Sequence, residues 1–417
     1  MPRGGTAKSG IVRRRNFLKA AGVGVVSASL AGCIGDDDDD DEDDGPITIA
    51  GLQPYSGPFS LYGDMHTAGV DFAIEEINEN GGVLDGRELE HEAQDTGSDP
   101  ADALTIVTGM IEDHDPVAIV GPVSSDVVLN VVGDAEEQEI PLFIHAGGDP
   151  AEITRDSRYT FRTANLPATV WALSFQELID DRGWDRAAAI VADYAWGRAL
   201  EAALDHYLGD DIDLYMEVAP FAEDDFTTHL RDIPEDIEFL IGSGHPPGVH
   251  PMYSQALEIG LEPELFAAAI APTTASIGAL GEEVTQSLAT GTQPDMFSDE
   301  FAEVAERFYD ETGEQFDSSS ATGYATVEMI ADAIEAAGTA DSSEVGDALH
   351  TEEFDTLFAE PMQYTEWGEP DQQVHILSGY ELGDTDYPPE TEIRPTEVFR
   401  SEPLPGRDPD EDPYETD

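Results

Sequence analysis

Short apolar runs alternate with longer amphipathic stretches along most of this chain. The apolar runs of the first half predict strands at residues 47–52, 117–121 and 141–144, and residues 89–93 give a weaker one. Amphipathic stretches predict helices at residues 66–79, 99–111 and 125–137. In the first of these, Val70, Ile74 and Ile77 share one face, and Gly81-Gly82 ends the helix.

The same alternation repeats in a second block, with strands predicted at residues 187–192, 213–218, 239–242 and 265–270. Strands that alternate with helices form parallel sheets covered on both faces. The fold class is therefore α/β, with two doubly wound, Rossmann-like lobes. Ligands of such sheets bind at the carboxyl ends of the strands. The candidate ligand-binding loops therefore follow Leu52, Gly121, Ile144, Ala192 and Gly242.

The first 32 residues have the layout of an export signal. Arg14 and Arg15 precede Phe17-Leu18-Lys19, and an apolar stretch at 20–31 is too short to span a membrane. The twin arginine resembles the signal of the Tat pathway, and Leu30-Ala31-Gly32-Cys33 resembles a lipobox that ends on the lipid-accepting cysteine. A basic tail followed by an ordinary core helix is the alternative. The order and spacing of the two motifs favour the signal.

Residues 33–45 follow as a lipidated cysteine and an acidic linker. Cys33 is the only cysteine, so no disulfide can form within the chain, and the residues at 36–44 are all acidic. Like charges extend such a linker and hold the folded part away from the lipid. We expect a protein outside the cytoplasm, anchored to the cell membrane through Cys33, and a loose acidic tail at 400–417.

The charge balance points to a salty environment. Six of the 18 basic residues precede Cys33, which leaves twelve arginines against 90 acidic residues and a charge of −78 after the signal. Such a chain repels itself strongly unless salt screens it, so we interpret it as a halophile's protein, from a haloarchaeon. Disorder is the alternative, but the periodic segments and 40% hydrophobic content argue against it. A nucleic-acid partner is excluded, because no basic patch exists.

A series of short motifs resembles the leucine/isoleucine/valine-binding proteins, which are type I periplasmic, substrate-binding proteins of ABC transporters. The motifs occur in family order over residues 46–385: Tyr55-Ser56-Gly57-Pro58, Leu61-Tyr62-Gly63, Glu76-Ile77-Asn78, Gln94-Asp95-Thr96, Gly121-Pro122-Val123-Ser124-Ser125, Tyr159-Thr160-Phe161-Arg162-Thr163 and Asp193-Tyr194-Ala195-Trp196-Gly197. The resemblance implies two lobes joined by three crossings, near residues 165, 295 and 350. Residues 46–165 and 295–350 would form the N-terminal lobe, and 166–294 and 351–399 the C-terminal lobe.

The resemblance also implies a function. The protein would be a solute-binding lipoprotein that closes its lobes on a small molecule and delivers it to an ABC permease. We expect a monomer without a cofactor and without enzyme activity, since no nucleophile elbow, P-loop or His-Glu-x-x-His motif occurs. A secreted α/β hydrolase and a ligand-sensing ectodomain of the same fold remain the alternatives.

Candidate ligand contacts in the first lobe lie after two strands. Ser124 and Ser125 stand at a strand-to-helix junction, where a hydroxyl and free helix N–H groups hold a carboxylate or where the serine merely caps the helix. Gly147 and Gly148 offer backbone N–H groups at close approach. Asp149 stands where the family has a hydroxyl, and it would repel an anionic ligand unless it turns away as a cap.

Two aromatic residues and two positions of the second lobe complete the candidates. Tyr62 and Trp196 would enclose an apolar ligand from opposite lobes, with core packing as the alternative for Trp196. His245 follows a strand and is a cleft contact; a metal site with His250 is disfavoured by the irregular Pro-Pro spacing. Ile270 stands where amino-acid binders of the family hold the ligand ammonium with a carboxylate.

These departures leave the ligand open. One hypothesis is a carboxylate-bearing or neutral compound without an α-ammonium, because an unpaired ammonium buried beside Ile270 would cost several kcal/mol. The other is an amino acid held in an altered register through Asp149 or His245, with branched-chain amino acids as the default that the resemblance implies.

We predict that export depends on the twin arginine and retention on the cysteine. Replacing both Arg14 and Arg15 by lysine should leave precursor in the cytoplasm, and Cys33→Ser should release the exported protein into the medium. Fractionation with immunoblotting measures both. Normal surface display of the double-lysine variant, or membrane retention of Cys33→Ser, would contradict the corresponding part of the prediction.

We further predict that salt decides folding. The Debye length falls from about 10 Å at 0.1 M salt to about 3 Å at 1 M, which removes most long-range repulsion in a chain of this charge. Helical circular dichroism should be lost below roughly 0.1 M monovalent salt and recovered in molar salt. A melting temperature that does not change over this range would refute the prediction.

Overall fold

A computed structural model of the protein describes residues 45–163, 166–221, 223–244, 248–268, 271–383 and 392–410. Export residues Arg14, Arg15 and Cys33 lie outside these ranges, as do most of the acidic linker, His245, Ile270 and the end of the tail. In the described part, no helix is long and apolar enough to cross a membrane.

The first lobe is built on a five-stranded parallel sheet of order β2-β1-β3-β4-β5. Its strands are β1 (Ile47–Gln53), β2 (Leu89–Asp95), β3 (Ala118–Val120), β4 (Leu142–Ile144) and β5 (Thr160–Arg162). The helices are α1 (Ser60–Glu79), α2 (Pro100–His114), α3 (Ser125–Glu137), α9 (Asp299–Thr312), α10 (Ser318–Ala337) and α11 (Ser342–Leu349), with a 3₁₀ turn at Pro150–Glu152 and a small hairpin of β11 (Gln363–Tyr364) and β12 (Pro370–Asp371).

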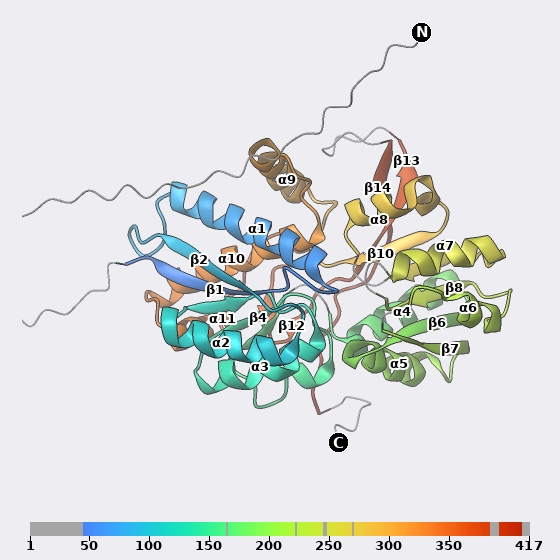
Figure 1. Ribbon diagram of the computed structural model, residues 1–417, viewed down its shortest axis with the longest axis horizontal. Helices are drawn as coiled ribbons and strands as arrows, with labels where there is room; N and C mark the ends of the chain where they lie inside the picture. The colour runs from blue at the N-terminus through green and yellow to red at the C-terminus, as the bar shows by residue number, and fades with distance from the viewer. Residues whose placement is uncertain are drawn as a thin grey trace, which may run out of the picture. The chain divides into compact units, whose positions relative to one another are not determined.

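The second lobe holds a seven-stranded sheet of order β14-β13-β10-β9-β8-β6-β7 (Figure 1). Five strands run parallel: β6 (Arg186–Asp193), β7 (Asp213–Pro220), β8 (Phe239–Gly242), β9 (Leu265–Ala268) and β10 (Leu288–Thr292); β13 (Ile376–Leu382) and β14 (Ile393–Arg400) add an antiparallel edge. The helices are α4 (Ala168–Arg182), α5 (Ala195–Leu208), α6 (Thr227–Asp232), α7 (Val249–Ile259) and α8 (Thr273–Leu280), followed by a 3₁₀ turn at Gly281–Thr285.

Both sheets are covered on both faces, which confirms the prediction of two doubly wound α/β lobes. In β1, Ile47 and Ile49 pack toward α1 and α10, whereas Ala50 and Leu52 pack toward α2 and α3. In β6, Ala189 packs toward α4 and α5, and its neighbours in the strand pack toward α6 and α7. Successive strand residues point to opposite faces, so these apolar runs had to be buried on both sides.

The predicted helix at 66–79 begins six residues earlier than expected, at Ser60. The turn after Pro58 already places Phe59 and Tyr62 in an apolar cluster, so the first turn of the helix is held by packing rather than by a capping side chain. The other predicted strands and helices fall within a few residues of those observed. Strands β5, β10, β13 and β14 were not among the predicted strands.

The chain returns to the second lobe later than residue 350, where we expected the third crossing. Phe354, Phe358 and Tyr364 belong to the apolar core of the first lobe, together with Ile47 of β1. Only at Ile376, where β13 begins, does the chain join the seven-stranded sheet. The apolar side chains of residues 354–364 explain the difference, because they complete the core under α10 and α11.

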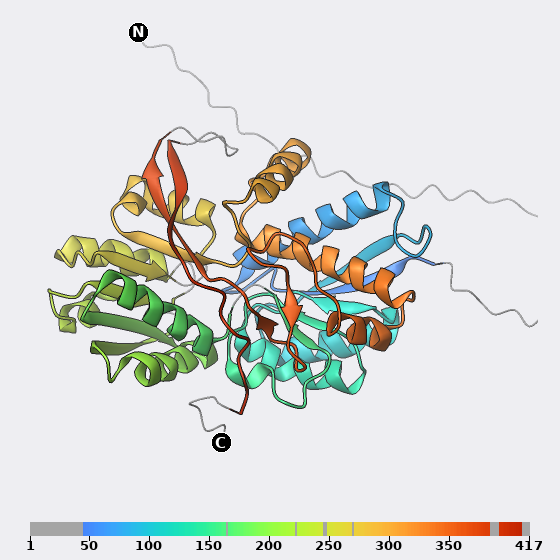
Figure 2. The ribbon, with the colours of Figure 1, turned by 180° about the vertical axis from the view of Figure 1, so that it is seen from behind.

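The stretch at 400–410, expected to be part of a loose tail, is packed on the second lobe at its start, where Glu177 of α4 accepts the N–H of Glu402, and on the first lobe at its end. Leu404 bridges to Gln373, and Arg407 is buried, with its Nη1 3.0 Å from Oε1 of Glu369. This segment leaves β14 and passes to the β11–β12 hairpin (Figure 2). In the described residues it makes a fourth connection between the lobes.

Arg407 belongs to a buried ion network centred on Arg162 at the end of β5. The Arg162 guanidinium lies 2.6 Å from Glu152 and 2.9 Å from Glu369, and all three side chains are at most 1% exposed. Burial opposes ionisation of Glu369, but Arg162 and Arg407 outweigh it and lower its pKa. For Glu152, burial outweighs Arg162 and raises the pKa to about 7. The network thus joins β5, the hairpin and the C-terminal segment.

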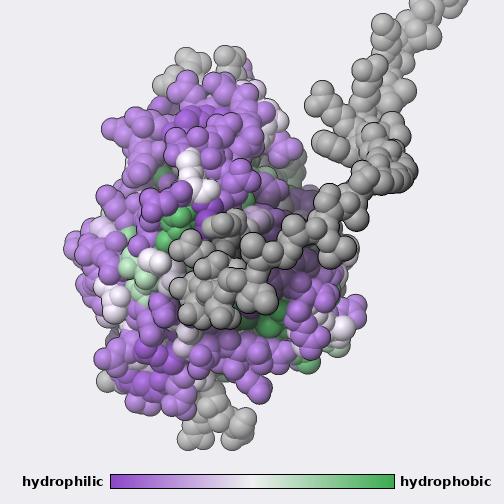
Figure 3. Space-filling view, turned by 90° about the vertical axis from the view of Figure 1, so that its left-hand side faces the viewer, coloured by the Kyte–Doolittle hydropathy of each residue, from purple (hydrophilic) through white to green (hydrophobic). Residues whose placement is uncertain are grey.

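The visible, described part of one face of the molecule is mostly hydrophilic, with a few scattered apolar residues (Figure 3). This surface agrees with a chain that carries 90 acidic residues. It is also consistent with an ordinary buried core under a highly charged exterior, in contrast to the disorder that charge alone would allow.

We predict that Arg407→Met destabilises the fold, because it leaves the buried Glu369 with one guanidinium in place of two. The expected loss is about 3 kcal/mol, measured by urea unfolding in molar salt. The matched control is Arg394→Met, which breaks the exposed pair with Glu381 and should cost about 1 kcal/mol or less. Equal losses in the two variants would show that the C-terminal segment contributes no more than a surface contact.

Candidate functional site

The carboxyl ends of the strands in both lobes contribute to one apolar cluster. From the first lobe it takes Phe59, Tyr62, Val123 and Ala146, and from the second lobe it takes a larger group that includes Leu166, Trp171, Tyr194 and Trp196. All of these side chains are buried. The loops that the strand pattern selected therefore meet between the lobes, as expected of ligand-binding loops in doubly wound sheets.

Tyr62 is fully buried in the first turn of α1. Its ring meets that of His145 edge-on, with 6.4 Å between ring centroids, and lies 6.5 Å from that of Phe59. Burial, and next the negative charge of Asp317, raise the pKa of Tyr62 well above its usual value. The phenol is therefore neutral, and it contributes an apolar ring with one hydroxyl to the cluster between the lobes.

Two buried histidines stack beside Tyr62. The rings of His66 and His145 are 4.2 Å apart, and Gln53 Nε2 donates to His66 Nδ1 at 2.9 Å. Burial is the main cause that lowers both pKa values, that of His66 well below its usual value and that of His145 to about 3. Both imidazoles are therefore neutral and act through hydrogen bonding. In the described residues, neither His145 Nδ1 nor Gln53 Oε1 has a hydrogen-bond partner.

The two serines of the β3–α3 junction differ in their contacts. Ser124 is the N-cap residue of α3, but its side chain makes no capping bond. Ser125 is the first helical residue, and its Oγ accepts the N–H of Gly148 at 3.2 Å. The hydroxyl thus ties the next cleft loop to the helix, and in this conformation it occupies one of the N–H groups that we assigned to a ligand.

Gly147 and Gly148 do form a close backbone approach. A Cβ atom at Gly147 would lie 2.6 Å from Glu152 Oε1 and 2.9 Å from a methyl group of Ile144, so a larger residue would displace the loop. The carbonyl of Gly147 accepts a hydrogen bond from Arg162 Nη1. The ion network therefore fixes the shape of the loop from below.

Asp149 adopts the second of the two roles that we considered for it. Its carboxylate accepts the N–H of Ala151 at 2.8 Å and caps the 3₁₀ turn at 150–152. Its carbonyl lies 3.4 Å from Arg162 Nη2. Capped in this way, Asp149 is not directed at a ligand, which removes the expected repulsion and also weakens its candidacy as an ammonium anchor.

Trp196 packs as a core residue at the start of α5. It is 2% exposed and meets Trp171 edge-on, with 6.1 Å between ring centroids. One aromatic contact that joins the lobes involves residues that the sequence analysis did not select. Phe221 follows β7 and lies 5.0 Å from Tyr194 of its own lobe and 5.8 Å from Phe59 of the other lobe.

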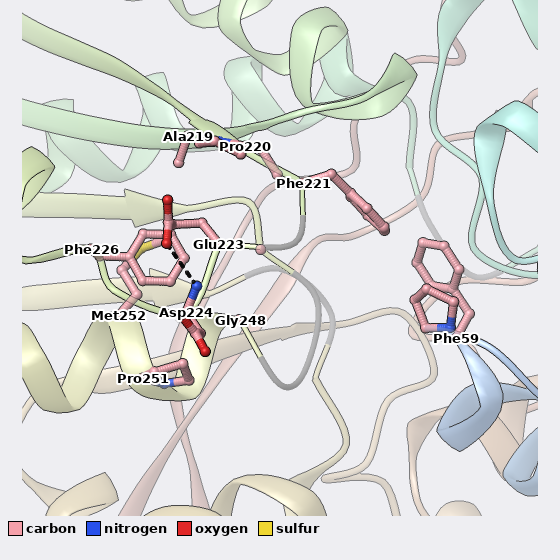
Figure 4. Close-up of a pocket in the computed structure, with 13 residues that line it drawn as sticks. Phe59, Ala219, Pro220, Phe221, Glu223, Asp224, Phe226, Gly248, Pro251 and Met252 are labelled. Carbon is pink, nitrogen blue, oxygen red and sulfur yellow. Dashed lines mark hydrogen bonds between the residues drawn. The ribbon is translucent and has the colours of Figure 1, made fainter.

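A cavity of about 470 Å³ opens beside this aromatic contact (Figure 4). It lies at the carboxyl ends of β6, β7 and β8, and its wall is largely apolar, with contributions from Pro58, Phe59, Ala192, Ala219, Pro220, Phe221, Phe226, Gly244, Gly248, Pro251 and Met252. The charged lining residues are Glu223 and Asp224. Glu223 Oε1 accepts the N–H of Asp224 at 3.1 Å, which leaves the carboxylate at the cavity wall.

His245 and Ile270 lie outside the described residues, so their roles as ligand contacts stay predictions. Nearby His250 is described and buried, with Nε2 3.2 Å from Ser276 Oγ. Burial lowers its pKa to about 4. Among the described residues, no group of three or more histidine, cysteine or acidic side chains is placed to hold a metal ion.

Sequence reasoning missed Gln53, His66, Phe59, Phe221 and Glu223. Phe59 and Gln53 flank the loop after β1, which the strand pattern did select, so position after a strand was a usable indication. His66 lies within a helix, where nothing distinguishes it from a core residue. Phe221 and Glu223 follow a strand that was predicted, but its end was not among the loops considered.

Comparison with known proteins relates most of the described region to one family. Residues 46–379 match the model of a family described as periplasmic binding protein. The leucine-, isoleucine-, valine-, threonine- and alanine-binding protein of Pseudomonas aeruginosa is 25% identical over 319 residues, which are 74% of this chain and 83% of that protein. The substrate-binding protein BasB of a chemotactic signal transduction system in Halobacterium salinarum is 32% identical over 175 residues. That alignment spans only 40% of this chain and 42% of the relative.

Solved structures share the fold at low identity. An amino acid ABC transporter substrate-binding protein from Pseudomonas fluorescens superposes with a TM-score of 0.76 at 18% identity, covering 88% of this chain and 98% of that one. A leucine-binding protein from Thermotoga maritima gives a TM-score of 0.70 at 20% identity, covering 83% and 99%. The two-lobed architecture is therefore common to all three chains.

Proposed function

Because this chain belongs to the periplasmic binding protein family, we propose that it captures a small solute between its lobes outside the cytoplasm and delivers it to an ABC permease. Proteins of this family bind solutes and are not enzymes, which sets aside the secreted hydrolase. The observation that carries the proposal is the apolar cluster shared by Phe59 and Tyr62 of one lobe and Tyr194 of the other, beside a cavity of about 470 Å³. Ligand sites of this kind are concave, largely apolar and edged by a few polar groups.

The ligand carries a compact apolar group. The cavity wall is made mostly of aliphatic and aromatic side chains, and its volume lies within the range of about 300–1,000 Å³ that is usual for small-molecule sites. Branched-chain amino acids lead the candidates, since the relative in Pseudomonas aeruginosa is named for binding leucine, isoleucine and valine. Related amides and carboxylates without an ammonium are the alternatives.

The charged groups at the cavity help to choose between an amino acid and a ligand without an ammonium. Glu223 and Asp224 are acidic, and no arginine is among the described residues that line the cavity. An ammonium would be stabilised by these carboxylates, whereas a ligand carboxylate would need the N–H and hydroxyl groups of the first lobe. An amino acid in an altered register, with its ammonium toward Glu223 and not beside Ile270, satisfies both requirements.

A second function is favoured by one observation. The relative in Halobacterium salinarum is named as part of a chemotactic signal transduction system. A sensing role would require a separate signalling partner in the membrane in place of, or besides, a permease. In a strain that lacks this chain, loss of uptake of the labelled ligand indicates transport, and loss of chemotaxis with normal uptake indicates sensing.

The anchor belongs to the proposal as well. Proteins of this family act outside the cytoplasm, and the twin arginine with the lipobox-like segment supports export followed by attachment through Cys33. A lipid at Cys33 would keep the binding protein near its membrane partner. The −78 charge after the signal supports the further proposal of a halophilic source.

We predict micromolar binding of leucine, isoleucine or valine in molar salt, measured by calorimetry against their 2-oxo acids and amides. Glu223→Gln should weaken amino-acid binding on the order of tenfold, the effect of losing one ion pair with the ammonium, and should leave 2-oxo acids unaffected. Glu112→Gln, at an exposed position of α2, is the matched control. Mass spectrometry of molecules released on denaturation identifies the natural ligand directly.

Two results would contradict this proposal at different levels. Leucine binding that is unchanged in Glu223→Gln, Asp149→Asn and His245→Ala would refute the assignment of the ammonium site while leaving the binding function intact. A purified protein that releases no small molecule and binds none of the amino acids, 2-oxo acids or amides would refute the proposed ligand class.

A further inference from the structure

The carboxylate of Asp317 joins the two lobes. Asp317 is the N-cap residue of α10 in the first lobe, and its Oδ1 accepts the N–H of Ser318 at 2.7 Å. The same carboxylate also accepts three hydrogen bonds from the second lobe. These come from the N–H of Thr273 at 3.0 Å, and from the N–H and the hydroxyl of Thr274, both at 2.9 Å.

Thr273 and Thr274 are the first two residues of α8, whose N-cap is Pro272 and which has no capping side chain of its own. Asp317 therefore supplies from across the lobe boundary the acceptor that α8 lacks. One carboxylate serves the amino ends of two helices in different lobes, where the dipoles of both helices favour a negative charge.

The surroundings make this contact depend on the relative position of the lobes. Asp317 is 1% exposed, and within the described residues it takes part in no ion pair with an arginine or histidine. A buried carboxylate is tolerated when donors surround it, and most of the donors here belong to α8. When the lobes separate, the carboxylate loses those donors and α8 loses its cap.

The contact also lies next to the candidate site. Helix α10 packs closely on α1, since a Cβ atom at Gly69 would meet the carbonyl of Ser320 at 1.9 Å. The first turns of α1 carry Tyr62 and His66, and the charge of Asp317 contributes to the raised pKa of Tyr62. Helix α8 follows β9, whose carboxyl end faces the same region.

We infer that Asp317 is the latch of lobe closure: its carboxylate holds the amino end of α8 when the lobes are together and releases it when they part. The inference rests on the proposed function, in which closure retains the solute. Part of the free energy of closure then comes from Asp317, which has no need to touch the ligand. Asp317 is therefore a positioning residue.

The substitution Asp317→Asn separates the latch from the helix cap. Asparagine is as good an N-cap residue as aspartate, so α10 keeps its cap. Its side chain carries no charge and has an NH₂ group in place of one carboxylate oxygen, so while the remaining oxygen stays on Ser318 and Thr273 it cannot accept the N–H and hydroxyl of Thr274. Thr274→Val is a second, milder variant that removes only the hydroxyl bond from the side of α8.

The matched control is Asp341→Asn. Asp341 caps α11 by accepting the N–H groups of Ser343 and Glu344, all within the first lobe. The same change of side chain there tests the cost of losing a capping charge without touching the lobe boundary. Circular dichroism in molar salt checks that each variant is folded.

The test measures the distance between the lobes in the ligand-free protein. Spin labels are attached at Glu112→Cys in α2 and Glu258→Cys in α7, both exposed, in the full chain carrying Cys33→Ser, which removes its only native thiol. Double electron–electron resonance in molar salt then gives the populations of short and long distances. Asp317→Asn should lower the ratio of closed to open protein on the order of tenfold, the effect of losing one charge-assisted hydrogen bond.

Thr274→Val should shift the ratio in the same direction by less, and Asp341→Asn should leave it unchanged. Distance distributions of Asp317→Asn and Thr274→Val that both coincide with that of the parent protein would overturn the inference. So would an equal shift in Asp341→Asn. Because no ligand is added, this outcome is independent of the calorimetry and leaves the proposed binding function standing.

Discussion

A fully buried guanidinium, that of Arg162, fixes the conformation of the loop after β4 in the first lobe. A charge without access to water must be matched by partners in place, and Arg162 finds them in Glu152, Glu369 and the carbonyls of Gly147 and Asp149. Two of these partners are backbone groups of the loop after β4. Because their carbonyls point toward Arg162, the conformation of the loop is set before any ligand arrives. The same ion network reaches Arg407, and so the C-terminal segment supports the loop from a distance of more than 200 residues along the chain.

The chain has few cationic side chains, and most of them form ion pairs. Within the described ranges, ten arginines form ion pairs with carboxylates: Arg155, Arg158, Arg162, Arg182, Arg186, Arg198, Arg307, Arg394, Arg400 and Arg407. Most of the few arginines therefore stabilise the fold, and none of these ten lines the cavity. Under the proposed function, a negative group on a solute would then be held by hydroxyl and N–H donors, such as the neutral Tyr62 and the amino end of α3.

The sequence was sufficient for most strands of the two parallel sheets, but not for β5, β10 and the antiparallel edge, nor for the long-range contacts. Strands such as β1 and β6 are continuous apolar runs, so their period and length could be read directly, and the loops at their carboxyl ends were placed correctly between the lobes. The role of Arg162 could not be read, because its partners Glu369 and Arg407 are distant in sequence and resemble many other charged residues. Asp149 illustrates a second limit of sequence-based prediction. A carboxylate after a strand can cap a turn or contact a ligand, and only the bond to Ala151 distinguishes the two roles. Leu404 and Arg407 lie in a Pro- and Asp-rich stretch whose composition is typical of a loose tail, yet Leu404 packs in an apolar cluster and Arg407 joins the buried ion network.

The contacts between the lobes are of kinds that survive in concentrated salt. At the molar salt that we expect this chain to require, exposed ion pairs are screened within about 3 Å, so they contribute little to closure. The aromatic contact of Phe59 with Phe221 is not screened, and burial of apolar surface does not weaken as the salt concentration rises. The bonds of Asp317 to α8 are shielded from the solvent by burial and depend on fixed backbone donors rather than on a mobile counter-charge. Under the proposed function, closure therefore combines an undirected apolar contact with one directed carboxylate, that of Asp317, which fixes the position of α8 relative to α10.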